Sequence, residues 1–289
     1  MSLPTVLTIA GSDPSGGAGI QADCKSIHAL GGYALSVATA LTAQNSQGVQ
    51  GVYPVSADAF KAQLDSLLAD YQIDAVKIGM LAEASKIETV SELLENLSVP
   101  VVLDPVLVSS SGTVLLQQKA IQNLTEKLLP QVTLVTPNLP EAQLLLKQAG
   151  FNDSLQKALQ DNETIPARAF AEMGIQNLLL KGGHQTGSMA CDALFEKLQS
   201  EPQIHSFCKP RLQVQHSHGT GCTLSSAIAT FLARGETLPN AVQKSKQYLH
   251  QTLAYAGQAQ PHYRSSLQES ERKGGLNHFL MGMNQDGTE

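Results

Sequence analysis

The sequence lacks a segment that could anchor it in a membrane. Its longest apolar stretches are short and are flanked by glycine, proline or charged residues, whereas a membrane-spanning helix needs about 20 consecutive apolar residues. The N-terminus has no basic region followed by an apolar core, which a signal peptide would require. We therefore expect a cytoplasmic protein without a membrane partner.

Cysteine and positive charge are also sparse. The four cysteines show no C-x-x-C spacing, so neither a zinc site nor a disulfide framework is expected. They are Cys24, Cys191, Cys208 and Cys222. The 19 Lys and Arg against 25 Asp and Glu give a formal net charge of −6, and nucleic-acid binding requires clustered basic residues. A nucleic-acid partner is therefore not expected. The pattern G-x-x-x-x-G-K-[ST] is absent as well, so any bound nucleotide must be held by another structure.

What the sequence does contain is a regular alternation of short apolar strands and longer amphipathic segments, typical of βαβ units around a mostly parallel sheet. We expect strands at residues 5–10, 33–40, 74–78, 99–104, 132–136 and 177–181. Helices are expected at residues 20–30, 57–70, 84–96, 117–128, 139–148 and 220–234. No repeat or low-complexity linker divides the chain. We expect one domain over residues 1–260 and a tail over residues 261–289 that is partly packed or flexible.

Unusual residues follow the ends of the expected strands. Because all carboxyl ends of parallel strands open onto one edge, where ligands of such sheets bind, they predict one extended cleft. These residues are Gly11, Gly79, Asp104, Asn138 and Gly182.

The segment from Gly219 to Cys222 opens an expected helix. Two glycines let the backbone approach a ligand, and the first helical turn offers unpaired N–H groups to an anion. This combination suits a phosphoryl group in transfer. The alternative is a tight loop in which Thr220 caps the helix and Cys222 is a small buried residue. On these four residues alone we prefer that alternative.

Oxygen and ammonium groups lie on the neighbouring loops. Asp104, Asn138 and Glu141 could supply oxygen ligands to a hydrated Mg²⁺, and Lys181 places a cation where nucleotide phosphates would lie. Taken singly, Asn138 fits a turn residue, Glu141 a charge in a helix's first turn, and Lys181 a solvated strand end.

Two further segments have competing interpretations. Gln44, after the second strand, could donate and accept hydrogen bonds on an aminopyrimidine edge, and Asp23 faces either the same pocket or solvent. Gly17-Ala18-Gly19 is a near match to a dinucleotide-binding loop. The histidines lack metal-ligand spacing and are interpreted as surface or turn residues; those near the motifs are His184, His216 and His218.

Together these motifs resemble the hydroxymethylpyrimidine/phosphomethylpyrimidine kinases of thiamine biosynthesis, within the ribokinase-like superfamily. The segments that carry the resemblance occur in family order and span residues 9–23, 42–45, 77–81, 103–106, 136–141, 181–184 and 218–225. The resemblance implies a three-layer α/β sandwich, often a homodimer, that uses ATP and Mg²⁺. Its implied activity is phosphorylation of 4-amino-5-hydroxymethyl-2-methylpyrimidine and then of the monophosphate.

The resemblance also implies roles for individual residues. The pyrimidine would contact Gln44, with Gly11, Asp23 and Met80 around it. The nucleotide would be bound by Lys181, Asn138, Thr136 and Gly182, and the metal by Asp104 and Glu141. An anion hole would be formed by Gly219, Thr220 and Gly221, and Cys222 would take the position of the catalytic base. We expect the helix N-terminus to lower the pKa of this thiol.

Three other functions remain open from the sequence. A pyridoxal kinase of the same superfamily is the nearest, although the two-cysteine members would want a second cysteine in residues 100–116, which have none. The others are a nicotinamide-dependent oxidoreductase that uses Gly17–Gly19, and a cofactor-binding module without catalysis.

Overall fold

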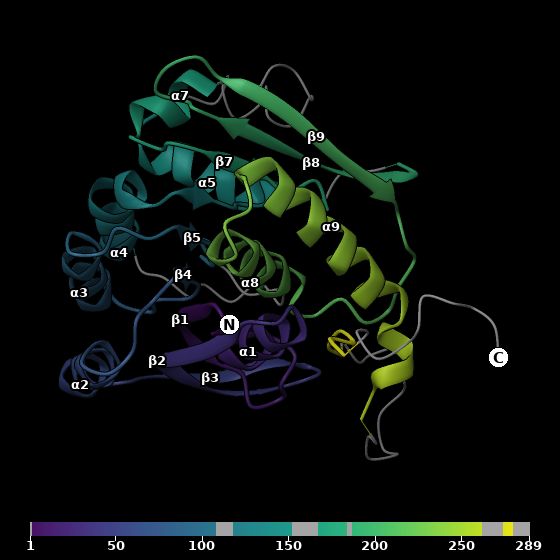
Figure 1. The fold of residues 1–289 in the computed structure, drawn as a ribbon, viewed down its shortest axis with the longest axis horizontal. Coiled ribbons are helices and arrows are strands. Elements are labelled where there is room, and N and C mark those ends of the chain that lie inside the picture. The colour runs from purple at the N-terminus through teal and green to yellow at the C-terminus, as the bar shows by residue number, and fades with distance from the viewer. Residues whose placement is uncertain (1, 108–117, 152–166, 184–186, 262–273, 280–289) are drawn as a thin grey trace.

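The structure is a computed structural model that describes residues 2–107, 118–151, 167–183, 187–261 and 274–279. Within these ranges nine strands form one sheet, in the order β3-β2-β1-β4-β5-β6-β7-β8-β9 (Figure 1). Their bounds are β1 Thr5–Ser12, β2 Tyr33–Asn45, β3 Gly48–Pro54, β4 Ala75–Ile78, β5 Val101–Leu103, β6 Leu134–Val135, β7 Leu178–Leu180, β8 Met189–Glu196 and β9 Gln203–Pro210.

The sheet is parallel from β2 to β7 and antiparallel at both edges. From β1 the chain first adds β2 on one side and then β4 on the other. In open α/β sheets, ligands bind outside the carboxyl ends of the strands at such a point of reversal. The mostly parallel α/β sheet expected from the sequence is confirmed.

Helices cover both faces of the sheet and complete a three-layer sandwich (Figure 1). Neighbouring residues of β1 alternate between the faces: Leu7 packs with the cluster that includes Phe60 of α2, and Val6 with the cluster that includes Ile228 of α8. The helices are α1 Gly19–Ala29, α2 Ala57–Leu68, α3 Ala84–Leu94, α4 Gln118–Asn123, α5 Leu139–Gln148, α7 Ala167–Glu172, α8 Thr220–Ala233 and α9 Leu238–Ala254. A π-helical turn at Leu124–Leu128 and short 3₁₀ turns at Leu129–Gln131 and Ala256–Ala259 complete the elements.

Several elements differ from the sequence expectation. Strand β2 continues to Asn45 instead of ending near residue 40, so Gln44 lies within the strand and pairs with Val49 of β3. The strands β3, β8 and β9 and the helices α7 and α9 were not expected. β9 is an edge strand whose exposed and half-buried residues alternate, so it has no apolar run to mark it. α9 buries one face at helical spacing, including Ala241, Ser245 and Tyr248, and that pattern was available in the sequence.

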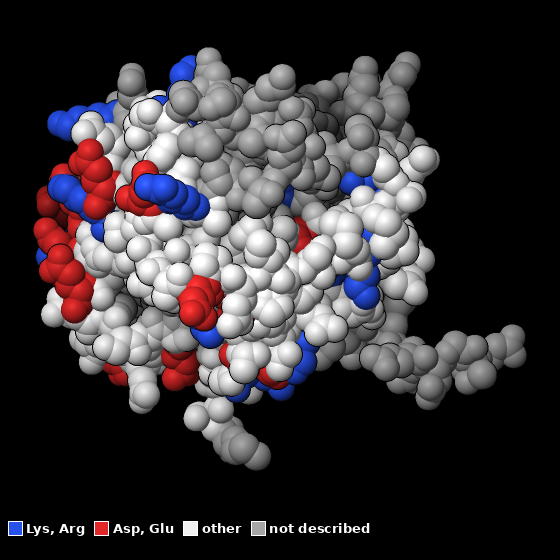
Figure 2. Space-filling model, turned by 90° about the horizontal axis from the view of Figure 1, so that it is seen from above, with Lys and Arg blue, Asp and Glu red and all other residues white. Residues whose placement is uncertain are grey.

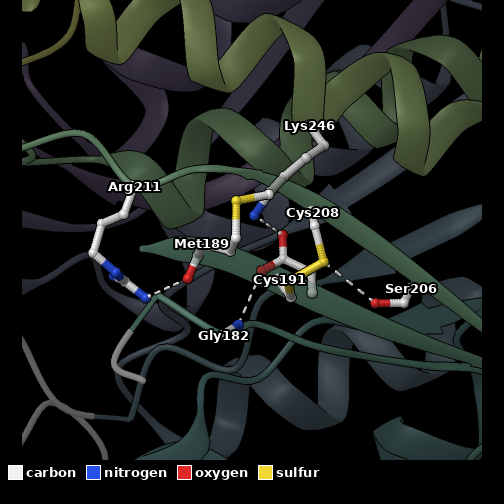
Figure 3. The surroundings of a disulfide bond; sticks show 8 residues. Gly182, Met189, Cys191, Ser206, Cys208, Arg211 and Lys246 are labelled. Atoms are coloured by element: carbon white, nitrogen blue, oxygen red, sulfur yellow. Dashed lines mark hydrogen bonds and ion pairs between the residues drawn. A yellow bond between two sulfur atoms is a disulfide. The ribbon is translucent and has the colours of Figure 1, made fainter. Parts of the chain in front are cut away.

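A disulfide bond joins Cys191 on β8 to Cys208 on β9 (Figure 3). The expectation that the cysteines form no disulfide is therefore wrong for this pair. The two residues are 17 positions apart, but the antiparallel register places them directly opposite each other, with their Cα atoms 4.0 Å apart. A rule based on C-x-x-C spacing cannot detect such a cross-strand pair, because strand register decides it. Cys24 and Cys222 are free thiols.

The described part of the C-terminal tail, Gly274–Phe279, packs against the domain. The His218 N–H donates to the Gly274 carbonyl, and the Tyr248 hydroxyl donates to the His278 carbonyl. The imidazole of His278 is buried and bonds to the Thr223 hydroxyl at 3.0 Å. The boundary at residue 260 stays a prediction, and most of the remaining tail lies outside the described residues.

The surface carries charges of both signs. On the face that Figure 2 presents, the described Lys and Arg side chains are scattered among Asp and Glu. Among the described helices, none combines the length and the hydropathy that a bilayer span requires.

Candidate active site

A cavity of about 490 Å³ opens at the carboxyl edge of the parallel strands. It lies at the point of reversal between β1 and β4, because Gly11 at the end of β1 and Met80 after β4 both line it. It also brings together most of the residues that the sequence singled out: Gln44, Asp104, Asn138, Glu141, Lys181, Gly219, Thr220, Gly221 and Cys222. The single cleft expected from the strand ends is thus present.

The start of α8 forms one wall of the cavity. Gly219 has a φ of 86°, and a Cβ there would lie 1.8 Å from the Gly17 carbonyl oxygen, so this position requires glycine. At Gly221 a Cβ would lie 2.9 Å from Asp104 Oδ2 and 3.3 Å from Lys181 Nζ. The first helical turn, whose N–H groups have no partners within the helix, therefore lies directly beside a carboxylate and an ammonium group.

Three charged groups face one another at this end of the cavity. Lys181 Nζ lies 2.6 Å from Asp104 Oδ1 and 3.8 Å from Glu141 Oε2. Burial lowers the pKa of Lys181, but the attraction of Asp104 and Glu141 outweighs it, so the pKa is raised and the ammonium stays charged. For Glu141, burial and then repulsion by Asp104 raise the pKa to about 7, against the attraction of Lys181 and a bond from the Asn138 N–H.

A capping box fixes Glu141 and Asn138 at the start of α5. The Asn138 side chain accepts from the Glu141 N–H at 2.9 Å, and Glu141 Oε2 accepts from the Asn138 N–H at 2.8 Å. Both residues therefore have the local role that the sequence allowed as an alternative. They also line the cavity, and the two roles are compatible because each side chain keeps an oxygen lone pair.

The Cys222 thiol does not have the lowered pKa expected at a helix N-terminus. Burial raises its pKa to about 11, and the nearby Asp23 and Asp104 add to this, while Lys77 and a bond from the Gly19 N–H oppose it. The expectation is wrong because the cost of burying a thiolate exceeds the gain from the helix end. In the protein without ligands Cys222 is a protonated thiol.

Asp23 does not line the cavity. It is fully buried, and both of its oxygens bond to Lys77 Nζ, at 2.9 and 2.8 Å. The hydroxyls of Thr8 and Ser226 donate to the same carboxylate. With its lone pairs occupied in this way, Asp23 has no free face for a substrate.

Thr136 and Gly182 also lie outside the cavity lining. The Thr136 hydroxyl is buried 3.4 Å from Asp104 Oδ1. The Gly182 N–H donates to Asp192 Oδ1 at 2.9 Å, and Lys246 Nζ donates to Asp192 Oδ2 at 2.6 Å (Figure 3). Thr136 thus lies beside Asp104, and Gly182 is next to Lys181 in the chain. Asp104 and Lys181 both line the cavity.

The part of the cavity around Gln44 also contains His218 and the carboxylate of Asp13. Gln44 faces His218, whose Nε2 lies 3.0 Å from Gln44 Nε2 and 2.8 Å from Asp13 Oδ2. Burial raises the pKa of Asp13, but the bonds from His218 and Ser15 outweigh burial and hold the pKa below its usual value.

His218 is a site residue that the sequence interpretation missed, and Asp13, which also lines the cavity, is another. We interpreted His218 as a surface or turn residue, yet its side chain is 14% exposed and lines the cavity. Its position immediately before Gly219 was the available signal. His216 accepts from the Gly274 N–H, and His184 lies outside the described residues.

The sequence profile described as phosphomethylpyrimidine kinase matches residues 13–265. The chain belongs to the phosphomethylpyrimidine kinase family. It is 46% identical over 251 residues to the hydroxymethylpyrimidine/phosphomethylpyrimidine kinase of Escherichia coli K12, a match that covers 86% of this chain and 91% of that protein.

Solved structures show the same fold for this kinase family. The phosphomethylpyrimidine kinase of Clostridium difficile 630 is 37% identical, with a TM-score of 0.68, over 86% of this chain and 98% of that one. The pyridoxal kinase of Staphylococcus aureus in complex with AMP-PCP and pyridoxal is 27% identical, with a TM-score of 0.79, over 98% and 96%. The ribokinase-like fold and the assignment as a kinase are confirmed, and the oxidoreductase and binding-module alternatives are not supported.

Proposed function

We propose that this kinase transfers the γ-phosphoryl group of ATP to the hydroxymethyl oxygen of 4-amino-5-hydroxymethyl-2-methylpyrimidine, and then phosphorylates the resulting monophosphate. One observation carries the proposal: a single cavity has the neutral amide of Gln44 at one end and the anion-binding start of α8 beside Asp104 and Lys181 at the other. An amide suits an aminopyrimidine edge, which presents a donor and an acceptor side by side.

The phosphate end would act mainly through position and charge. Lys181 and the N–H groups at the start of α8 would bind the phosphate oxygens, whose negative charge is spread over the transferring group. In the proposed step, the bond from γ-phosphorus to the bridging oxygen breaks, a bond to the substrate oxygen forms, and the alcohol proton leaves.

Cys222 would lie beside the alcohol at the start of α8. Because its pKa of about 11 keeps the thiol protonated, it cannot act as a strong base before transfer begins. A loose transition state removes little charge from the alcohol oxygen early in the reaction. A neutral thiol cannot accept the proton, so the alcohol proton would pass to an oxygen of the transferred phosphoryl group. Cys222 would hold the alcohol oxygen in place through a hydrogen bond.

Asp104 and Glu141 fit a Mg²⁺ that is shared with the nucleotide. The two carboxylates face the one ammonium of Lys181, and burial is the main cause that raises the pKa of Glu141 to about 7. In the described residues no group of three or more His, Cys, Asp or Glu could hold a metal, so phosphate oxygens and water would complete the coordination. When bound, Mg²⁺ would neutralise phosphate charge.

A pyridoxal kinase is the second candidate, because the solved pyridoxal kinases give TM-scores of 0.78 to 0.80. Their identities of 29% and 28% are nevertheless lower than the 46% to the pyrimidine kinase of Escherichia coli. A panel of substrates assayed for ADP release separates the two. We expect kcat/KM for the aminopyrimidine alcohol to exceed that for pyridoxal by at least about tenfold. An equal or reversed preference would overturn the substrate assignment, and no ADP release with either alcohol would overturn the proposal as a whole.

The quaternary state and location belong to the same proposal. A homodimer is supported by Leu41 and Tyr53, which are opposite each other on β2 and β3 and are 54% and 63% exposed. Light scattering on the purified protein would test it. A cytoplasmic location stays a prediction.

A further inference from the structure

The side-chain amide of Gln44 lies in a chain of hydrogen bonds that links two loops with the strands β1 and β2. On one side it faces His218, which in turn faces Asp13. On the other side it faces the Thr42 hydroxyl at 3.2 Å, and that hydroxyl lies 2.9 Å from the Ser12 carbonyl oxygen. The other partners of each group determine whether it donates or accepts a hydrogen bond in this chain.

Asp13 fixes the proton on His218. Its Oδ1 accepts from the N–H and hydroxyl of Ser15, and its Oδ2 accepts from the Ala18 N–H at 2.9 Å. A carboxylate that receives these donors is ionised, and it accepts only. His218 Nε2, 2.8 Å from Oδ2, must therefore carry a proton, and this holds for the neutral imidazole and for the imidazolium alike.

The opposite side of the amide is fixed by Thr42. A hydroxyl has a single proton, and the Ser12 carbonyl oxygen can only accept, so the Thr42 proton is used there. Toward Gln44, Thr42 Oγ1 then offers a lone pair. The amide atom that faces Thr42 must be a donor.

These two conclusions require the same orientation of the amide. With Gln44 Nε2 toward His218, two N–H donors face each other at 3.0 Å, and Gln44 Oε1 faces a hydroxyl whose proton is already engaged. A half-turn of the amide places Nε2 toward Thr42 Oγ1 and Oε1 toward the His218 N–H, which Oε1 then shares with Asp13 Oδ2 in a three-centre bond. The oxygen and nitrogen of an amide have nearly the same shape, so the hydrogen-bond network decides the orientation.

We propose that Asp13 and His218 are positioning residues that, with Thr42, hold the Gln44 amide in this one orientation and so set which donor–acceptor edge the pyrimidine end of the cavity accepts. The remaining N–H of Nε2 and lone pair of Oε1 stay free for a ligand. A freely turning amide would pair equally well with an edge of an amine beside a ring nitrogen and with the reversed edge of a carbonyl beside a ring N–H. The held amide distinguishes the two. This inference rests on the proposed function for the identity of the ligand.

The test compares two alcohols that differ only in this edge: the 4-amino pyrimidine and its 4-oxo counterpart, 5-hydroxymethyl-2-methylpyrimidin-4-one. The readout is the ratio of their kcat/KM values in wild type and in three variants. His218→Phe keeps a ring beside Gly17 but removes the Nε2 donor. His218→Gln carries an amide nitrogen that reaches the position of Nε2. Thr42→Val removes the hydroxyl while keeping the shape.

We expect His218→Phe to lower the amino-to-oxo ratio by about tenfold or more, mainly through the KM of the alcohol, with the KM of ATP unchanged. His218→Gln should restore most of the ratio, and Thr42→Val should lower it by a smaller factor. A purely structural role would reduce turnover of both alcohols equally. An unchanged ratio in both His218→Phe and Thr42→Val would overturn the inference.

A neutron structure of the unliganded wild-type protein tests the inference without any substrate. Hydrogen on His218 Nε2, with Gln44 Oε1 facing it, would support the assignment. An unprotonated Nε2 that accepts from the Gln44 amide nitrogen would overturn it. If wild type turned over neither alcohol, the proposed function would fail, and this second measurement would still decide the orientation of Gln44.

Discussion

Two lysine–aspartate pairs lie near the first turns of α8, and they differ in their access to the cavity. In the pair of Lys77 and Asp23, neither side chain is exposed, and the carboxylate also receives the hydroxyls of Thr8 and Ser226. Lys181 and Asp104 line the cavity, and the Lys181 side chain is 14% exposed. The first pair is fully satisfied within the protein, whereas the second keeps bonding capacity for a ligand.

Lysine and aspartate thus form a structural ion pair in one place and part of the candidate active site in the other. Asp23 was expected at the substrate, and its sequence position one turn into α1 could not exclude this. Its partners within the protein give it a structural role instead. Asp104 has similar burial, but it faces the helix start at Gly221. The number of hydrogen-bonding positions that remain open on a buried carboxylate therefore says more about its role than its exposed fraction does.

The largest effect on stability is expected from Lys77→Met. The substitution leaves the Asp23 carboxylate buried without a counter-ion, which costs about 3–5 kcal/mol. Urea unfolding monitored by circular dichroism measures the loss. The matched control is the double variant Lys77→Met/Asp23→Asn, which should recover part of it because no uncompensated charge remains. A loss below about 1 kcal/mol in the single variant would show that the Asp23 carboxylate does not depend on Lys77 as its counter-ion.

Lys181→Met should have a large effect on turnover and a small effect on stability. Turnover is expected to fall by about 10²–10³-fold, because a cation that stabilises the transferring phosphate is removed. The free energy of unfolding should change by only about 1–2 kcal/mol, since water in the cavity can solvate Asp104 and Glu141. Steady-state kinetics and urea unfolding on the same preparation measure both. A variant that unfolds as readily as Lys77→Met but keeps its turnover would reverse the two assignments.

A third buried group, His278, differs from both ion pairs because it is uncharged. Burial and then the charge of Lys25 lower its pKa to about 4, against an unfolded value of 6.5. Between these two pH values the unfolded chain binds a proton that the folded protein does not. Stability should therefore fall as pH decreases from 6.5 to 4, by about 3 kcal/mol for this group.

The pH dependence of urea unfolding in wild type and His278→Asn isolates this contribution. The variant lacks the titrating imidazole, so its stability should fall less steeply over the same interval. Lys77 and Lys181 do not contribute there, because their raised pKa values keep both residues protonated in the folded and unfolded protein. Equal slopes in the two proteins would show that His278 is not buried as a neutral group.

Much of the fold could be predicted from the sequence, because its buried parallel strands are apolar runs that end in glycine, asparagine or a carboxylate. Those strand ends also predicted the cavity, and three of the five, Gly11, Asp104 and Asn138, line it. The edge strand β9 escaped prediction because its exposed face interrupts the apolar pattern, and β8 because the buried Asp192 does so. The Cys191–Cys208 bond escaped for a related reason: it depends on the register between two strands that were not predicted.

The errors at the site have a common physical origin. The helix position of Cys222 predicted a lowered pKa, but burial, which depends on packing around the whole residue, raised it instead. His218 has no distinctive spacing, and its importance comes from Asp13, which is 205 residues away in the sequence. Local patterns identify the groups of a site, whereas long-range contacts decide their protonation and orientation.

Cys222→Ala provides the most direct test that phosphoryl transfer takes place at the start of α8. Turnover of the aminopyrimidine alcohol should fall by about 10²-fold or more, because the alcohol oxygen is no longer held in line with the γ-phosphorus, while the KM of ATP stays the same. Turnover within a few-fold of wild type would contradict the account and leave Cys222 as a packing residue.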